Sequence, residues 1–267
     1  MKRALFYLVL GLAAITFLYP FLWMIATTFK PPSEAGTLSL LPDAPTLDNY
    51  RAMFARAPVG RAMINSLLVA TTVTASVLVL GSLPAYALAR LDFPGRRFVH
   101  GVTLAYLLVP SQLTLIPLYS LIVRLGWVDS YRALIVPFLF NAPGVLMLHK
   151  FFLQIPRSLV DAARLDGMSE VRIVFGVFWP LARPALATVG IVTFMGTWNE
   201  VLWPLLVVRD QSTMTMPQLL TVFTLGGGAG TLGIQLAAAT VLIVPVIVAY
   251  AFLQRHFIES MAGGVKG

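Results

Sequence analysis

The sequence predicts an all-α integral membrane protein with six transmembrane helices. Hydrophobic residues make up 58% of the 267 residues and charged residues only 11%, whereas a soluble domain has about a quarter charged. The mean hydropathy of +0.84 places the whole chain in the membrane class. The long apolar stretches show no period-2 alternation, and open strands cannot cross lipid, so we expect helices and not a barrel.

Six apolar stretches are each long enough to cross a hydrocarbon core of about 30 Å, which takes about 20 residues. The first follows Lys2 and Arg3 and exceeds the roughly 7–15 apolar residues of a secretory signal, so we expect a retained helix. The fourth is short and can extend through His149 to Phe152. The predicted spans are Leu5–Phe29, Ala62–Ala89, Phe98–Val123, Ala133–Leu148, Ala185–Val208 and Leu232–Leu253.

The distribution of basic residues predicts that both termini lie in the cytoplasm. In that orientation, twelve of the 19 lysines and arginines fall in cytoplasmic segments and seven in outer ones, as the positive-inside rule requires. The same rule accounts for the net charge of +8. The bases lie in loops between apolar runs and form no continuous basic face, so we expect no nucleic-acid partner.

Two outer loops carry recognisable local patterns. Residues 30–61 begin with several prolines and then predict a short surface helix over residues 47–54, capped by Asp48. The loop at 209–231 ends in the run Gly226–Gly230, which predicts a flexible segment. That run lacks the lysine of a phosphate-binding loop and follows no predicted strand.

The segment 156–184 is a polar loop in an otherwise apolar protein. Its pattern predicts a short helix, a tight turn and a second helix on the cytoplasmic face. Ser158 and Asp161 have the spacing of a capping box, and the acid meets the positive end of the helix dipole. Asp166 and Gly167 form a helix stop in which the glycine takes the left-handed conformation.

Small residues and a proline complete this loop. Ala162 and Ala163 leave little side chain, so another surface can approach the backbone closely. Ser169 can cap the second helix, and Pro180 breaks the chain before the fifth span. An amphipathic interfacial helix without a partner is the alternative interpretation. The joint spacing of the acid, the two alanines, the glycine and the proline favours a docking loop.

The loop resembles the "EAA" signature of the permease subunits of bacterial ABC importers, on which the cognate ATPase docks. Three positions depart from the usual pattern. Asp161 stands where the family has Glu, Met168 stands where it has a small residue, and Trp179 stands where it has Leu. The likeness extends along nearly the whole chain and is to the carbohydrate group of maltose-type and glycerol-phosphate-type permeases. Other segments that carry it are Thr28–Glu34, Asn65-Ser66, Ala85–Gly95, Ile116–Leu118, Trp198–Glu200 and Gly263–Gly267.

The resemblance implies the type I ABC importer permease fold and one half of a translocation pore. It implies a first transmembrane helix and outer loop at 1–61, a transmembrane domain at 62–256 with the coupling loop at 156–184, and a cytoplasmic tail at 257–267. The ATPase-docking residues implied by the motif are Asp161, Ala162, Ala163, Asp166, Gly167 and Pro180.

The resemblance also implies partners: a homologous second permease, two ATP-binding subunits and an extracytoplasmic solute-binding protein. ATP and Mg would be bound by the ATPases, which would drive alternating access for a sugar or sugar-like solute through the loop at 158–180. The implied location is a bacterial inner membrane, in contact with lipid. In the chain itself we expect no catalytic residue, cofactor or metal, because it has no phosphate-binding loop, no cysteine and no histidine motif.

Few ionisable residues fall within the predicted spans. Glu200 is the exception, and a carboxylate at membrane depth is a functional candidate by default. It can instead lie at the outer mouth, paired with a base such as Arg209. The neighbouring Asn199 is a further pathway candidate. Asn141 and Gln112 can face a polar pathway or bond between helices. An ion-coupled secondary transporter component is the alternative function, but it would need more such carboxylates and an internal repeat, which the sequence lacks.

Overall fold

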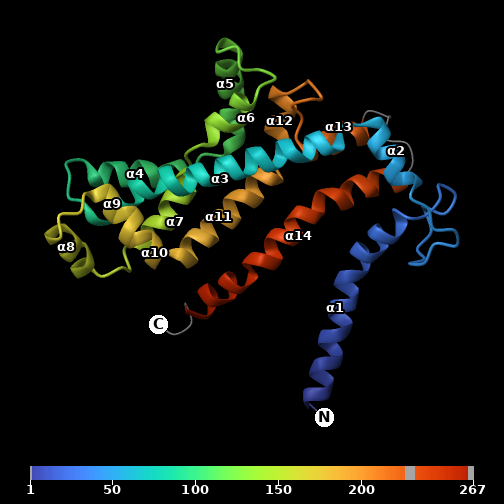
Figure 1. Ribbon diagram of the computed structural model, residues 1–267, viewed down its shortest axis with the longest axis horizontal. Helices are drawn as coiled ribbons and strands as arrows, with labels where there is room; N and C mark the ends of the chain where they lie inside the picture. Colours follow the sequence, from blue (N-terminus) through green and yellow to red (C-terminus); the bar gives the residue numbers. More distant parts are fainter. Residues whose placement is uncertain (1, 226–231, 264–267) are drawn as a thin grey trace.

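The computed structural model describes residues 2–225 and 232–263, which form helices and loops with no strand among them (Figure 1). The predicted glycine run at 226–230 and the last four residues of the predicted tail lie outside the described residues. The helices are α1 (Lys2–Thr27), α2 (Asp48–Arg56), α3 (Val59–Arg90), α4 (Arg96–Tyr106), α5 (Ser111–Arg124), α6 (Tyr131–Ile135), a 3₁₀ turn η1 (Val136–Phe138), α7 (Ala142–Phe152), α8 (Arg157–Leu165), α9 (Glu170–Ile173), a π-helical turn η2 (Val174–Phe178), α10 (Trp179–Leu181), α11 (Arg183–Trp198), α12 (Leu202–Val207), α13 (Met216–Leu225) and α14 (Leu232–Gly263).

Within the described residues, three helical segments are long and apolar enough to cross a membrane without a sharp bend. They are Leu5–Thr27, Val59–Arg90 and Tyr131–Phe152, which match the first, second and fourth predicted spans. The last of these includes α6, η1 and α7, so the short fourth span does extend to Phe152. The sixth predicted span is α14, which is apolar over Leu232–Val248.

The third and fifth predicted spans are not continuous helices. The third is bent by 99° between α4 and α5, because Pro110 has no backbone N–H with which to continue α4. The fifth ends at Trp198, and α12 begins after a short break. A further bend of 91° separates residues 170–181 from α11. We therefore take α11 as the spanning helix and the preceding turns as part of the loop.

Helix α3 is the centre of the fold and packs against α7 and α11 (Figure 1). Its buried residues recur every fourth position at Val69, Val73 and Val77, as a helix with one packed face requires. The contact with α7 is close at Gly144, where a Cβ would lie 2.7 Å from a methyl carbon of Val77. The α3–α7 packing therefore depends on a glycine at this position.

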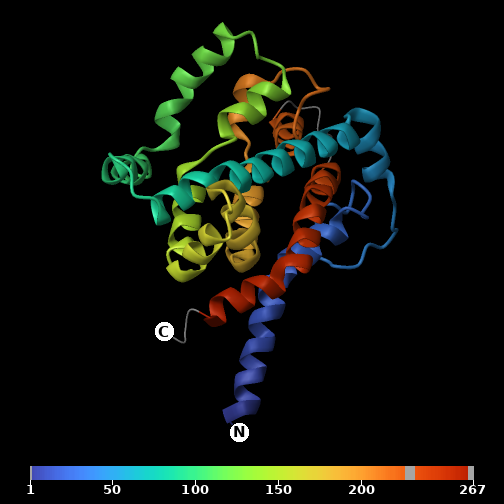
Figure 2. The ribbon, with the colours of Figure 1, turned by 60° about the vertical axis from the view of Figure 1, so that its left-hand side comes forward.

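Helix α1 stands apart from the other helices, as Figures 1 and 2 show, and it contacts α14. Its side chains are exposed from Leu5 through Leu22. Such a long exposed apolar surface must contact lipid or another protein chain.

The loop between α1 and α2 is held by buried polar groups. Lys30 is fully buried, and its ammonium donates to the Thr37 carbonyl at 2.9 Å and the Ser39 carbonyl at 2.7 Å. Asn49 in α2 donates to the carbonyl of Lys30 at 2.8 Å. The predicted cap at Asp48 is wrong: Asp48 is the first helical residue, and its carboxylate pairs with Arg51 at 3.1 Å.

The two ends of α3 hold different loops. At one end, the Asn65 amide donates to the carbonyls of Ser212 and Met214, and the Tyr131 hydroxyl donates to its oxygen at 2.6 Å. At the other end, Tyr86 contacts the loop at 156–182. The two contact points lie about 31 Å apart at a rise of 1.5 Å per residue, which is about the thickness of a bilayer core.

Candidate functional site: a coupling loop and a cavity at three helix breaks

The loop predicted to dock the ATPase folds as a helix, a tight turn and a second helical segment. Helix α8 ends in a complete Schellman motif: the Met168 N–H donates to the Ala163 carbonyl and the Gly167 N–H to the Arg164 carbonyl, both at 3.0 Å. Gly167 has a φ of +76°, so the predicted left-handed glycine is confirmed. The turn is fixed by backbone geometry that a side chain at this position would strain.

Three details of this loop differ from the prediction. The N-cap of α8 is Pro156, which places Ser158 inside the helix and makes the predicted capping box wrong. Ser169 does precede the next helix, but its side chain forms no capping hydrogen bond. The chain does not break at Pro180, which lies inside α10, but at Ala182, directly before α11. Proline is tolerated there because it stands in the first turn of α10.

The predicted docking residues divide into an exposed group and one buried residue. Ala163 is buried against the chain's own core, so its small size serves internal packing. Leu165, which was not predicted, is 89% exposed and stands directly before the turn. The exposed members are Asp161, Ala162, Asp166, Gly167 and Pro180.

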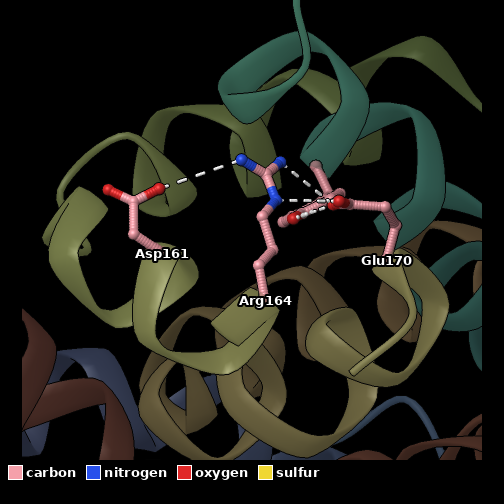
Figure 3. A network of polar contacts seen from close by, with 4 residues as sticks. Asp161, Arg164 and Glu170 are labelled. Carbon is pink, nitrogen blue, oxygen red and sulfur yellow. Dashed lines mark hydrogen bonds and ion pairs between the residues drawn. The ribbon is translucent and has the colours of Figure 1, made fainter. Parts of the chain in front are cut away.

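A polar network connects the two halves of the loop with α3. Figure 3 shows the Arg164 guanidinium between the carboxylates of Asp161 and Glu170. The Arg164 Nε lies 2.8 Å from Glu170 Oε1, whereas its contact with Asp161 is long, at 3.9 Å. The hydrogen bond from Arg164 lowers the pKa of Glu170, and the same bond raises the pKa of Arg164. The buried Tyr86 hydroxyl donates to the other oxygen of Glu170.

The C-terminal end of α3 contacts the end of α7 as well. The Arg90 guanidinium donates to the carbonyls of Phe152 and Ile155, which lie at the negative end of the α7 dipole. The Phe178 ring packs edge-on against Tyr86, at 4.9 Å between centroids, and against Phe152, at 5.0 Å. The loop, α3 and α7 thus form one packed unit.

Two departures from the usual loop pattern have structural partners. The Trp179 indole N–H donates to the Ser82 hydroxyl at 2.9 Å. The Met168 methyl lies 3.3 Å from the position that a Cβ on Gly176 would take. The methionine side chain therefore fills the space that the missing side chain of Gly176 leaves. Sequence reasoning missed Tyr86, Arg90 and Glu170. Their only signal was an acid just beyond the glycine turn and two polar residues at the end of the second span.

The second region is a cavity of about 670 Å³, which we call the break cavity. It is lined at three points where a helical span is interrupted: residues 107–110 between α4 and α5, residue 141 between η1 and α7, and residue 200 between α11 and α12. Irregular backbone at membrane depth is tolerated where it is buried in protein or lines a water-filled cavity. The coincidence of three breaks at one cavity therefore points to a polar pathway.

Three of the four predicted pathway candidates, Gln112, Asn141 and Glu200, line the break cavity. Asn141 caps α7, since its Oδ1 accepts the Gly144 N–H at 2.7 Å. Glu200 also lines it, and its Oε1 accepts the Trp203 N–H at 3.1 Å. Asn199 is not among the lining residues, because its amide turns back to the Met195 carbonyl at 2.9 Å.

The alternative pairing of Glu200 with Arg209 does not occur in the described part of the chain. Instead, the backbone N–H of Arg209 donates to the Asp129 carboxylate, which also accepts the Asp210 N–H at 2.9 Å. No basic group lies within 4 Å of the Glu200 carboxylate among the described residues. The carboxylate is therefore held by backbone and left unneutralised.

Comparison with known proteins agrees with this architecture. Residues 53–263 match the family model of the binding-protein-dependent transport system inner membrane component, and the chain belongs to that family. It is thus a multi-pass membrane protein of the permease class.

The similar proteins are permeases of importers for sugars and related solutes. The chain is 35% identical to the arabinooligosaccharides transport system permease AraQ of Halalkalibacterium halodurans, over 97% of this chain and 96% of that protein. It is 33% identical to the trehalose transport system permease SugB of Mycobacterium tuberculosis, over 100% of this chain and 99% of that protein. Their names confirm the predicted resemblance to carbohydrate importer permeases.

A solved structure shares the fold. A chain from the crystal structure of a bacterial ABC transporter involved in the import of the acidic polysaccharide alginate superposes with a TM-score of 0.83. The identity is 22%, with 96% of each chain covered. The predicted all-helical importer permease fold is therefore confirmed.

Proposed function

We propose that this chain forms half of the translocation pore of an ATP-driven importer for a sugar or sugar-like solute. The relatives named for arabinooligosaccharide and trehalose transport support the solute class. The observation that carries the proposal is the pairing of two features. One is an exposed loop with a fixed glycine turn, and the other is a cavity at three helix breaks, which α3 lines at Val69 and Val73, about 20–26 Å along the helix from Tyr86.

The loop at 158–180 is the surface on which the partner ATPase docks in this proposal. Its backbone is fixed by the Schellman turn, and its outer face is formed by small and acidic residues beside the exposed Leu165. Closure of two ATPase subunits around nucleotide would displace α8. The displacement would reach α3 through the hydrogen bond between Glu170 and Tyr86, and it would reach α7 through Arg90.

A homologous second permease would complete the pore and cover part of the exposed apolar surface. The apolar side chains of α1 are exposed, and an apolar groove of about 710 Å³ lies between α3, α11 and α14. An extracytoplasmic binding protein would deliver the solute from the outer side, and both termini would lie in the cytoplasm.

Purification of the tagged chain together with its neighbours tests the proposal. We expect a second permease and two copies of an ATPase to co-purify, and the complex in proteoliposomes to take up labelled trehalose or arabino-oligosaccharide only with ATP and a binding protein. The isolated chain should show no ATP hydrolysis above background, since the sequence has no phosphate-binding loop. Saturable ATPase activity of the isolated chain, or uptake driven by an ion gradient without ATP, would refute the assignment.

A further inference from the structure

The break cavity is lined by groups that can hydrogen-bond an uncharged polyhydroxyl solute. Thr193 and Thr197 lie one turn apart on α11, and Ser111 and Gln112 lie at the start of α5. Thr215 is buried, and its hydroxyl has no hydrogen-bond partner in the described structure. A buried hydroxyl without a partner is costly, so a hydrogen-bonding molecule is expected beside it.

Aromatic rings supply the complementary apolar surface. Tyr106, Phe138 and Trp203 line the same cavity. The Phe138 and Trp203 rings meet edge to face at 5.9 Å between centroids, and the Trp203 indole N–H is fixed by the Ala133 carbonyl at 2.9 Å. Rigid rings beside a few placed polar groups are typical of a small-molecule site.

The charge of the break cavity is set by one carboxylate. Among the described residues that line it, Glu200 is charged, and none is lysine, arginine or histidine. The helix ends at the breaks partly offset one another: the positive ends of α5, α7 and α12 lie at the cavity, as do the negative ends of α4 and α11. The Glu200 carboxylate accepts one backbone N–H and has no base within 4 Å in the described chain.

We infer that the break cavity admits neutral polyhydroxyl or cationic solutes and repels anionic ones, such as sugar phosphates and uronates. This rests on the proposed function, because it assumes that the cavity is part of the pathway. An unneutralised carboxylate beside low-dielectric walls raises the local concentration of cations and lowers that of anions by tenfold or more. Its oxygens can also accept hydrogen bonds from solute hydroxyls.

Single cysteines can measure the sign of this potential, because the chain has no native cysteine. Thr197→Cys places a thiol in the cavity one turn before Glu200, and Thr193→Cys repeats the measurement two turns before it. The assembled complex is treated with trimethylammonioethyl, sulfonatoethyl or hydroxyethyl methanethiosulfonate, which are cationic, anionic and neutral. Rates of the charged reagents are divided by the neutral rate, which removes differences in thiol reactivity.

We expect the normalised rate to be about tenfold higher for the cationic than for the anionic reagent. Adding Glu200→Gln should bring the ratio of the cationic to the anionic normalised rate to about one, and adding Glu200→Asp should keep this ratio high. Asp43→Asn, which removes a carboxylate from the outer loop, is the matched control and should leave the ratio unchanged.

A ratio at or below one, or a ratio unaffected by Glu200→Gln, would overturn the inference. Failure of both cysteines to react with the neutral reagent would also overturn it, because the cavity would not be accessible to water. Solute uptake by the complex with the native sequence is measured in parallel. ATP-driven uptake combined with any of these results leaves the proposed function intact and refutes only the charge selectivity.

Discussion

The coupling loop and the break cavity are built in opposite ways. At the loop, Glu170 is held by Arg164 and Tyr86, and Arg90 donates to two backbone carbonyls. At the cavity, the helices are interrupted, Thr215 has no partner in the described chain and Glu200 has only a backbone contact. Paired groups make a region move as one piece, and free groups can bind a solute or water. In the proposed function, this contrast fits force transmission at one end of α3 and solute contact at the break cavity.

This comparison depends first on the two regions facing opposite sides of the membrane. We expect cysteines at Ser39, Ser130 and Ser212 to react with a membrane-impermeant maleimide in intact cells, and one at Ser169 to react only after permeabilisation. The contact points at Asn65 and Tyr86, about 31 Å apart along α3, are the physical basis. Labelling of Ser169→Cys from outside would contradict both the topology and the docking loop.

The largest functional loss is expected from Gly167→Leu. The φ of +76° makes a side chain there cost roughly 1 kcal/mol or more, and nothing in the described chain lies within 4 Å of an added Cβ. An added Cβ therefore meets no other part of the described chain, and in the proposed function the added bulk faces the ATPase. We expect near-normal abundance in the membrane, at least a tenfold fall in ATP-driven uptake and weak co-purification of the ATPase.

Gly126→Leu is a matched control for this substitution. Gly126 also has a positive φ, at +66°, and open space around its Cβ position, but it lies in an outer loop. The same backbone strain should lower its abundance to a similar degree and leave uptake per complex unchanged. Equal losses of uptake in the two variants would attribute the effect to strain and remove the evidence for docking at Gly167.

A smaller effect is expected from Tyr86→Phe. The ring and its contacts with Phe178 remain, while the hydrogen bond to the Glu170 carboxylate is lost, at a cost of about 1–2 kcal/mol in unfolding free energy. If this bond transmits the movement of the loop, solute transported per ATP should fall two- to fivefold. Tyr131→Phe loses a comparable bond to Asn65 at the outer end of α3 and serves as the control. A similar fall in both variants would show that general loosening of α3, and not transmission, is responsible.

The sequence predicted the loop well because its signals are local. A left-handed glycine after a helix follows from the spacing of Asp166 and Gly167, and the structure contains it. The cap at Ser158 was wrong because Pro156 is the N-cap and α8 begins at Arg157, two residues earlier than a serine cap at this position allows. The links from Glu170 to Tyr86 and from Trp179 to Ser82 were not predictable, since they join positions far apart in sequence.

The cavity was less predictable than the loop. Asn141 and Glu200 were recognised as polar residues in apolar runs, but their meeting with the break at 107–110 depends on how three spans pack. The bend of 99° in the third span could not be predicted from hydropathy, which averages over Pro110. Hydropathy reports how apolar a segment is and does not report whether its helix is continuous.

The smallest effect is expected at Asn141, where a role in capping α7 can be separated from a role in solute contact. Its Oδ1 caps α7 by accepting the Gly144 N–H, so Asn141→Ala should cost about 1 kcal/mol of stability and lower abundance. Asn141→Ser keeps a capping oxygen and should restore most of that loss. If the cap is its main role, uptake per assembled complex should change less than twofold in both variants, whereas Glu200→Gln alters the charge of the cavity. A fall of fivefold or more in the uptake per complex of Asn141→Ser, with abundance preserved, would instead assign Asn141 to solute contact. Asn141 would then join Glu200 and Thr215 among the groups that distinguish the break cavity from the coupling loop.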